Sequence, residues 1–177
     1  MYGEYTGNRL RTLVSKRITA IQHAPQQAEK LGILLELIPR ATEPIHSLFL
    51  LNMYSRPKCK AASVHDVITQ AIHKAGITGD FNAAHQLSGY KYSNTRGNAL
   101  HAIIKNHDLA LLTNPTSHTC MGNSVTKDTS QDLTITGHIP HVDWAHLGEY
   151  LGSDHAILAT TIHGTACLND WTKFREE

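Results

Sequence analysis

The strongest restriction on the fold comes from an unbroken apolar run at residues 48–51. A strand with one face in water alternates apolar and polar residues, whereas a strand covered on both faces is apolar throughout. The segment 45–54 is therefore expected to be a strand inside a sheet, with further layers of structure on both sides. The pair Arg56-Pro57 is expected to end that strand.

Strands and helices alternate along the rest of the chain. One amphipathic segment, capped by Ser63 and ended by Gly76, predicts a helix, and another, capped by Thr95, predicts a helix that ends at about residue 106. Residues 142–150 fit either a short helix or a connection. This mixture indicates an α/β protein, either a sandwich of two packed sheets or a doubly wound sheet. Strands are predicted at residues 10–15, 18–21, 31–38, 109–113, 132–136 and 155–162, the first two as a hairpin.

Length, charge and cysteine usage narrow the class of protein. A chain of 177 residues with 41% apolar residues predicts one folded domain. The formal net charge is +1, so no overall basic field marks a nucleic-acid binder. Cys59, Cys120 and Cys167 lie far apart without metal-ligand spacing, which predicts reduced thiols. With no apolar leader, we expect an intracellular protein, nuclear or cytoplasmic and not secreted.

A carboxylate and an amide follow one of the apolar segments, in the sequence Gly79-Asp80-Phe81-Asn82. On an extended backbone, residues two apart point to the same side, so Asp80 and Asn82 are expected to face one way and Phe81 the core. The acid can take a proton from water and the amide can hold a phosphate oxygen, which suits phosphoryl transfer. The same composition is also typical of an ordinary turn.

A second polar cluster, Ser153-Asp154-His155, runs directly into the apolar segment 156–159. A titratable pair at the mouth of a buried strand is where an α/β enzyme places a site, although Asp154 and His155 can also simply cap the strand entrance. A Ser-His-Asp hydrolase is disfavoured because Ser153 stands two residues before His155 and no Gly-x-Ser-x-Gly elbow is present.

These motifs, taken together and in this order, resemble the endonuclease/exonuclease/phosphatase superfamily, and most of all the endonuclease domain of non-LTR retrotransposons. The resemblance covers nearly the whole chain. It implies a four-layer α/β sandwich of two packed mixed sheets flanked by helices. The residues that carry it are Gly79-Asp80-Phe81-Asn82-Ala83, Asp132-Leu133-Thr134 and Gly152-Ser153-Asp154-His155, with support from residues 50–57, 96–98 and 109–115.

The resemblance implies hydrolysis of phosphate esters and gives each polar residue a role. Asp80 is implied as the general base or water-positioning acid, and Asn82 as the residue that steadies that water and a phosphate oxygen. His155 is implied as a donor to the phosphoryl oxygens as charge builds on them. Asp132 is implied to pair with His155, fixing its tautomer and raising its pKa.

The resemblance also implies a divalent metal, usually Mg²⁺, with Mn²⁺ as the alternative ion. Asp154 is expected on the metal side of the site, directly or through water, and Asp80 is the other expected ligand. Mg²⁺ binds through few carboxylates and keeps several waters. Tyr54, at the end of a strand, is expected to touch the scissile phosphate or the leaving oxygen; a core tyrosine with a hydrated hydroxyl is the alternative.

The chain departs from the family pattern at its start. The family begins with a strand carrying an Asn and then a Gln-Glu whose carboxylate is the main metal ligand, and neither Glu4 nor Glu36 stands in that context. Residues 1–177 are therefore expected to form a single domain that lacks its first strand or strands and binds metal weakly. Only Ile77 and Thr78 separate Gly76 from Gly79, so the strand there is either clipped or extended by the residues before it.

Three functions stay open on the sequence. The first is a metal-dependent, DNA-nicking endonuclease of the non-LTR retrotransposon type, with DNA as the partner and a reverse transcriptase domain or a missing N-terminal segment as further partners. The second is a catalytically silent remnant that keeps the fold and binds nucleic acid or protein. The third, a phosphatase, is disfavoured because Asp132-Leu133-Thr134 and Arg96-Gly97 are similar to the retrotransposon branch.

Overall fold

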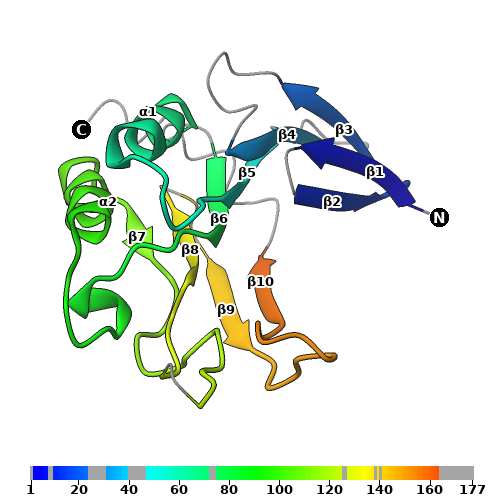
Figure 1. The fold of residues 1–177 in the computed structure, drawn as a ribbon. Helices are drawn as coiled ribbons and strands as arrows, with labels where there is room; N and C mark the ends of the chain where they lie inside the picture. Colours follow the sequence, from blue (N-terminus) through cyan, green and yellow to red (C-terminus); the bar gives the residue numbers. More distant parts are fainter. Residues whose placement is uncertain are drawn as a thin grey trace.

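A six-stranded mixed sheet forms the centre of the computed structural model, which describes residues 2–7, 10–23, 31–39, 47–71, 75–124, 127–137, 139 and 141–163 (Figure 1). Strands β5 and β6 pair in parallel, and the other neighbouring strands pair antiparallel. In spatial order the strands are β3 (Ile18–His23), β4 (Gly32–Pro39), β5 (Leu48–Tyr54), β6 (Ala75–Asp80), β8 (Asp132–Thr136) and β7 (Ala110–Leu111).

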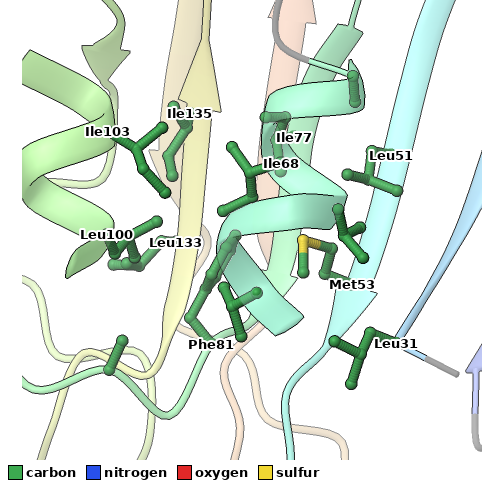
Figure 2. Close-up of a cluster of buried hydrophobic side chains, with 14 residues drawn as sticks. Leu31, Leu51, Met53, Ile68, Ile77, Phe81, Leu100, Ile103, Leu133 and Ile135 are labelled. Atoms are coloured by element: carbon green, nitrogen blue, oxygen red, sulfur yellow. The ribbon is translucent and has the colours of Figure 1, made fainter. Parts of the chain in front are cut away.

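The helices α1 (Ala61–Ala71) and α2 (Thr95–Asn106) contact each other and lie on one face of this sheet (Figure 1). Leu51 and Met53 of β5 and Ile77 of β6 point to that face and lie in one buried cluster with residues of both helices (Figure 2). Phe81 is fully buried in the same cluster, as the sequence predicts. The other buried members are Leu31, Val64, Val67, Ile68, Ala71, Ala83, Leu100, Ile103, Leu133 and Ile135.

The opposite face of the sheet is covered by the antiparallel pair β1 (Tyr2–Gly7) and β2 (Leu10–Ser15). Val14 of β2 packs against Ile33 and Leu35 of β4 in a second buried cluster. The side-chain amide of Asn52 in β5 donates to Thr12 Oγ1 of β2 at 3.1 Å. Strand β5 is therefore interior and covered on both faces. The predicted α/β sandwich is confirmed. Among the described residues, the α-helices of the sandwich lie on one side of the central sheet.

The predicted hairpin of residues 10–15 and 18–21 is wrong in its pairing. Both segments are strands, but β2 pairs with β1 and β3 pairs with β4. The turn at Lys16 and Arg17 carries the chain from one sheet to the other. A short alternating pattern identifies a strand, but it holds no information about which strand becomes the neighbour.

A third, two-stranded sheet consists of β9 (Val142–His146) and β10 (Leu158–Ile162). A short helix or a connection was predicted for residues 142–150, and both are wrong for β9. Burial alternates with period two from Val142 to His146, as in a strand. The last strand also begins later than predicted. His155 stands before it and forms an isolated antiparallel bridge with Cys120.

Element boundaries near the site differ from the predictions for local reasons. Strand β6 begins at Ala75, so of the two alternatives the extended strand is correct; its register with β5 runs from Phe49 to Tyr54. Helix α1 begins two residues before Ser63. The predicted cap of helix α2, Thr95, is wrong by one residue: Asn94 is the cap, and its side-chain oxygen accepts a hydrogen bond from the Gly97 N–H at 2.7 Å.

No helix in the described part of the chain is long and apolar enough to span a membrane. Two expectations stay predictions: that residues 1–177 form one domain, and that this domain lacks its first strand or strands.

Candidate active site

Three of the predicted site residues form a row across the central sheet. In the strand register, Tyr54 of β5 pairs with Asp80 of β6, and Asp80 pairs with Asp132 of β8. Their neighbours Met53 and Leu133 point to the helices. Because alternate residues of a strand point to opposite faces, the three site residues point away from the helices. The row therefore lies on the face opposite α1 and α2.

A close backbone approach fixes the position of Asp80. Gly79 has φ of 143°, and a Cβ placed on it would lie 1.9 Å from the carbonyl oxygen of Met53 in the adjacent strand. No other residue type fits there without moving the backbone. The backbone N–H of Ser55 also donates to the Asp80 carbonyl at 2.8 Å. These contacts hold the ends of β5 and β6 together at the position of Tyr54 and Asp80.

Gly79→Ala is expected to lower the free energy of unfolding by about 1–3 kcal/mol from overpacking, in addition to the cost of a positive φ. Gly148→Ala is the matched control, since Gly148 also has a positive φ, 74°, but nothing lies within 4 Å of the added Cβ. Urea unfolding of both variants measures the difference. Equal destabilisation would show that the approach to Met53 is not what requires glycine.

Asn82 holds the carboxylate of Asp80. Its backbone N–H and its side-chain Nδ2 both donate to Asp80 Oδ1, at 3.1 and 2.7 Å, and Nδ2 also donates to the Ser55 carbonyl at 3.1 Å. The two residues do meet, but through a turn in which Asn82 has φ of 46°, not through the predicted extended backbone. Both Nδ2 protons are used, so Oδ1 of Asn82 can accept from a water, whereas Nδ2 has no proton left for a phosphate oxygen.

Burial, and after it the nearby charge of Asp132, raise the pKa of Asp80, while the charge of His155 and the Asn82 hydrogen bonds lower it, and the net pKa is about 6. A carboxyl group with this pKa is ionised at neutral pH yet basic enough to accept a proton. This is the balance that a general base needs.

Asp132 contacts His155 directly, with 2.7 Å between Asp132 Oδ2 and His155 Nδ1. Burial lowers the pKa of His155, but the hydrogen bond and charge of Asp132, with the charges of Asp80 and Asp154, outweigh it, so the pKa is raised. Because Nδ1 faces a carboxylate, it carries a proton, and Nε2 is the nitrogen left for chemistry. The nearest oxygen of Asp154 lies 4.0 Å from that Nε2.

Helix α2 holds the loops around this site. Arg96 in its first turn donates to Ser55 Oγ at 3.2 Å and to the carbonyl oxygens of Arg56 and Pro57 at 2.6 and 2.7 Å. A Cβ on Gly97 would lie 1.8 Å from the Ala84 carbonyl oxygen, so the helix can approach the loop after β6 only with glycine there. The Arg96-Gly97 motif thus supports the site structurally.

A cavity of about 370 Å³ opens beside these residues. Asn82 and Asp154 line it, together with Tyr90, Tyr92 and Lys127. Burial raises the pKa of Tyr90 to about 12, so its hydroxyl stays protonated. The two tyrosines and the lysine were not predicted, because no pattern in their segments distinguishes them from surface residues.

Cys120 is a further residue of the site that the sequence pattern does not indicate. It exchanges two backbone hydrogen bonds of 2.9 Å with Thr129 on one side and bridges to His155 on the other. Its neighbour Thr119 accepts a hydrogen bond from the Asp132 backbone N–H at 3.0 Å through Oγ1. This small ladder attaches the segment that carries His155 to the end of β8.

The two predicted metal ligands keep carboxylate oxygens available for a hard divalent cation. Both hydrogen bonds from Asn82 go to Oδ1 of Asp80, which leaves Oδ2 for a ligand, and the side chain of Asp154 is largely exposed. Mg²⁺ is commonly held by one or two carboxylates together with waters and substrate phosphates. The two predicted ligands therefore offer the chemistry that such an ion needs.

The family model described as Endonuclease-reverse transcriptase matches residues 48–159, well over half of the chain. The chain belongs to this family. The matched segment contains every predicted site residue, from Tyr54 to His155. Nucleases of the wider endonuclease/exonuclease/phosphatase superfamily generally use divalent metals, and family and fold together support phosphodiester hydrolysis.

Solved structures show the same fold. The chain is similar to the endonuclease domain of TRAS1, a telomere-specific non-LTR retrotransposon, with a TM-score of 0.78 and 17% identity over 92% of this chain and 80% of that one. It is also similar to truncated TDP2 of Caenorhabditis elegans, with a TM-score of 0.53 and 16% identity over 93% and 76% of the two chains. No curated protein matches the sequence. The predicted resemblance to retrotransposon endonucleases is confirmed.

Proposed function

We propose that this protein is a metal-dependent endonuclease that nicks DNA. The observation that carries the proposal is the convergence of four polar residues from distant parts of the chain. Asp80 and Asp132 are neighbours in the sheet, Asn82 is hydrogen-bonded to Asp80, and His155 is hydrogen-bonded to Asp132. A chain that had lost its catalytic role would not need this arrangement, so a silent remnant is the less favoured alternative.

In the proposed reaction, Asp80 takes the proton of the attacking water. Its pKa of about 6 makes the carboxylate available at neutral pH. Asn82 holds the carboxylate in place, and its Oδ1 accepts a hydrogen bond from the same water. Tyr54, next to Asp80 in the register, places its hydroxyl toward the scissile phosphate or the leaving oxygen.

His155 stabilises the charge that develops on the phosphoryl oxygens. Its raised pKa favours the imidazolium, in which Nδ1 donates to Asp132 and Nε2 donates to the phosphate. Asp132 orients the ring and stabilises its charged form. Asp154 and Asp80 would hold Mg²⁺, or Mn²⁺ in its place, and such an ion would supply Lewis-acid stabilisation of the phosphate.

The cavity beside the site supplies contacts for a DNA strand. Tyr90 and Tyr92 offer aromatic faces on which bases can stack, and Lys127 offers a charge for the backbone. The net charge of +1 makes these local groups more important than any overall field. We infer that DNA contacts the protein over this cavity with the scissile phosphate at Asp80 and His155.

The test is nicking of supercoiled plasmid by the purified protein with MgCl₂, with EDTA and MnCl₂ as parallel conditions. The expected result is conversion to open circles with Mg²⁺ or Mn²⁺ and none with EDTA. Asp66→Asn is a matched control, because Asp66 lies on α1, on the other face of the sheet, and its variant should nick normally. Failure of the wild-type protein to nick under any of these ions would favour the remnant.

A further inference from the structure

We propose that Cys120, Asp154 and His155 form a binding site for Zn²⁺ that switches off the proposed nuclease. In the described part of the chain, these three side chains make up a group whose possible ligand atoms all lie within 4.8 Å of one another. A thiolate, an imidazole nitrogen and a carboxylate oxygen are ligands that Zn²⁺ takes in proteins, with a water in the fourth position. The thiolate makes this donor set softer than the one that Mg²⁺ prefers.

The backbone aims Cys120 and His155 at the same point. The N–H of Met121 donates to the Asp154 carbonyl at 2.7 Å, and the N–H of Ala156 donates to the Thr119 carbonyl at 2.8 Å. Cys120 and His155 lie between these two bonds, so they form a non-hydrogen-bonded antiparallel pair. This is the pair type in which opposite side chains come closest.

Only small movements are needed to close the site on an ion. Bonds of about 2.0–2.3 Å to a tetrahedral Zn²⁺ place ligand atoms roughly 3.3–3.8 Å apart. His155 Nε2 and Asp154 Oδ1 are 4.0 Å apart, and the side chain of Asp154 is 73% exposed and can adjust. The sulfur of Cys120 donates weakly to the Met121 carbonyl at 3.8 Å, a contact that costs little to give up.

Neighbouring residues hold two of the ligands in place before any ion arrives. Asp132 accepts the Nδ1 proton of His155, which leaves the Nε2 lone pair for a metal and matches the carboxylate–histidine–metal arrangement of many zinc sites. The paired hydrogen bonds to Thr129 fix the backbone of Cys120. When Zn²⁺ binds, the thiol proton of Cys120 and the Nε2 proton of the His155 imidazolium are both released to solvent, and zinc–sulfur and zinc–nitrogen bonds form.

The inhibitory half of this proposal depends on the proposed function. A Zn²⁺ ion on Nε2 occupies the atom that is proposed to donate to the phosphate, and it also takes Asp154 from Mg²⁺. Zinc binding and nuclease activity cannot then occur together at one site. Bound zinc therefore acts as an inhibitor that competes with both the hard metal and the substrate phosphate.

Direct metal binding tests the site without reference to activity. The variant Cys59→Ser/Cys167→Ser keeps Cys120 as its one thiol; titration with CdCl₂ should produce an ultraviolet thiolate-to-cadmium absorption band that saturates at one ion per chain. The affinity for Zn²⁺, measured with a fluorescent chelator as competitor, should match that of the wild type. Adding Cys120→Ser should abolish the band and weaken Zn²⁺ binding at least 10-fold, and adding Asp154→Asn should weaken it further.

A nicking assay tests the inhibition, with each protein normalised to its own zinc-free rate in Mg²⁺. Zn²⁺ should inhibit the wild type and Cys59→Ser alike, and Cys120→Ser should need at least 10-fold more Zn²⁺. No cadmium band in the variant that keeps Cys120, or a Zn²⁺ affinity unchanged by Cys120→Ser, would overturn the zinc site. Binding without any nicking in zinc-free protein would instead refute the proposed function and leave the metal site standing.

Discussion

Replacing Asp80 with asparagine is expected to slow nicking of supercoiled plasmid by a factor of about 10²–10⁴, the usual contribution of a general base. Asparagine has nearly the same shape and its Oδ1 can still accept both hydrogen bonds from Asn82. It cannot take a proton from water. Initial rates in Mg²⁺, measured against Asp66→Asn, give the size of the effect.

The same variant should keep or gain stability, which separates lost chemistry from lost fold. The folded-state pKa of Asp80, about 6, lies above its ordinary value of 3.8. Stability from this group is therefore present below pH 3.8 and is lost as the pH rises through about 6, because the folded protein then carries a buried charge. At pH 8, Asp80→Asn should melt at the wild-type temperature or above it. A large drop in the melting temperature of Asp80→Asn would show that its slower nicking comes from a damaged fold, not from the loss of a general base.

Asp132→Asn is expected to reduce the nicking rate by a similar factor, about 10²–10⁴, because an amide cannot stabilise a protonated His155 or fix its tautomer as a carboxylate does. The pH profile of kcat/KM gives the more specific result. Activity should rise through the pKa of Asp80 and fall through the raised pKa of His155. Removing the charge of Asp132 lowers both pKa values, so both limbs should move to lower pH.

The descending limb decides between two roles for Asp132. If the residue only supported the backbone near Thr119, the rate would fall but the limb would stay in place. A limb that does not move in Asp132→Asn would show that His155 is not the group that must be protonated. Asp66→Asn again provides the control, with an unchanged profile.

The sequence predicts the central sheet better than its surroundings, for a physical reason. Residues 133–135 and Leu51 are buried in the sheet and residues 48–50 are half-buried, so their apolar or alternating pattern directly reflects their environment. The partners of residues 10–15 and 18–23 are chosen by contacts with distant strands, which a local pattern cannot contain. Residues 142–146 carry Trp, His and Asp on a half-exposed strand, and their alternation is too weak to distinguish from a loop.

The site was predictable in its residue types but not in its full extent. The acid, amide and imidazole could be found because they border apolar segments in a family's order. Cys120, Tyr90 and Tyr92 enter the site from irregular segments whose paths depend on tertiary hydrogen bonds. Both Nδ2 protons of Asn82 are used because the Ser55 carbonyl, 27 residues earlier in the chain, lies beside it. A local sequence pattern does not contain such a contact.

The imidazole and the carboxylates of this site are carried by different parts of the molecule. Tyr54, Asp80 and Asp132 are rooted in the large sheet, whereas His155 sits on the short ladder with Cys120 and Thr129. Partial detachment of that ladder would withdraw the imidazole while the core stayed intact. On heating, catalysis should consequently fade some degrees before the far-ultraviolet signal of the protein changes.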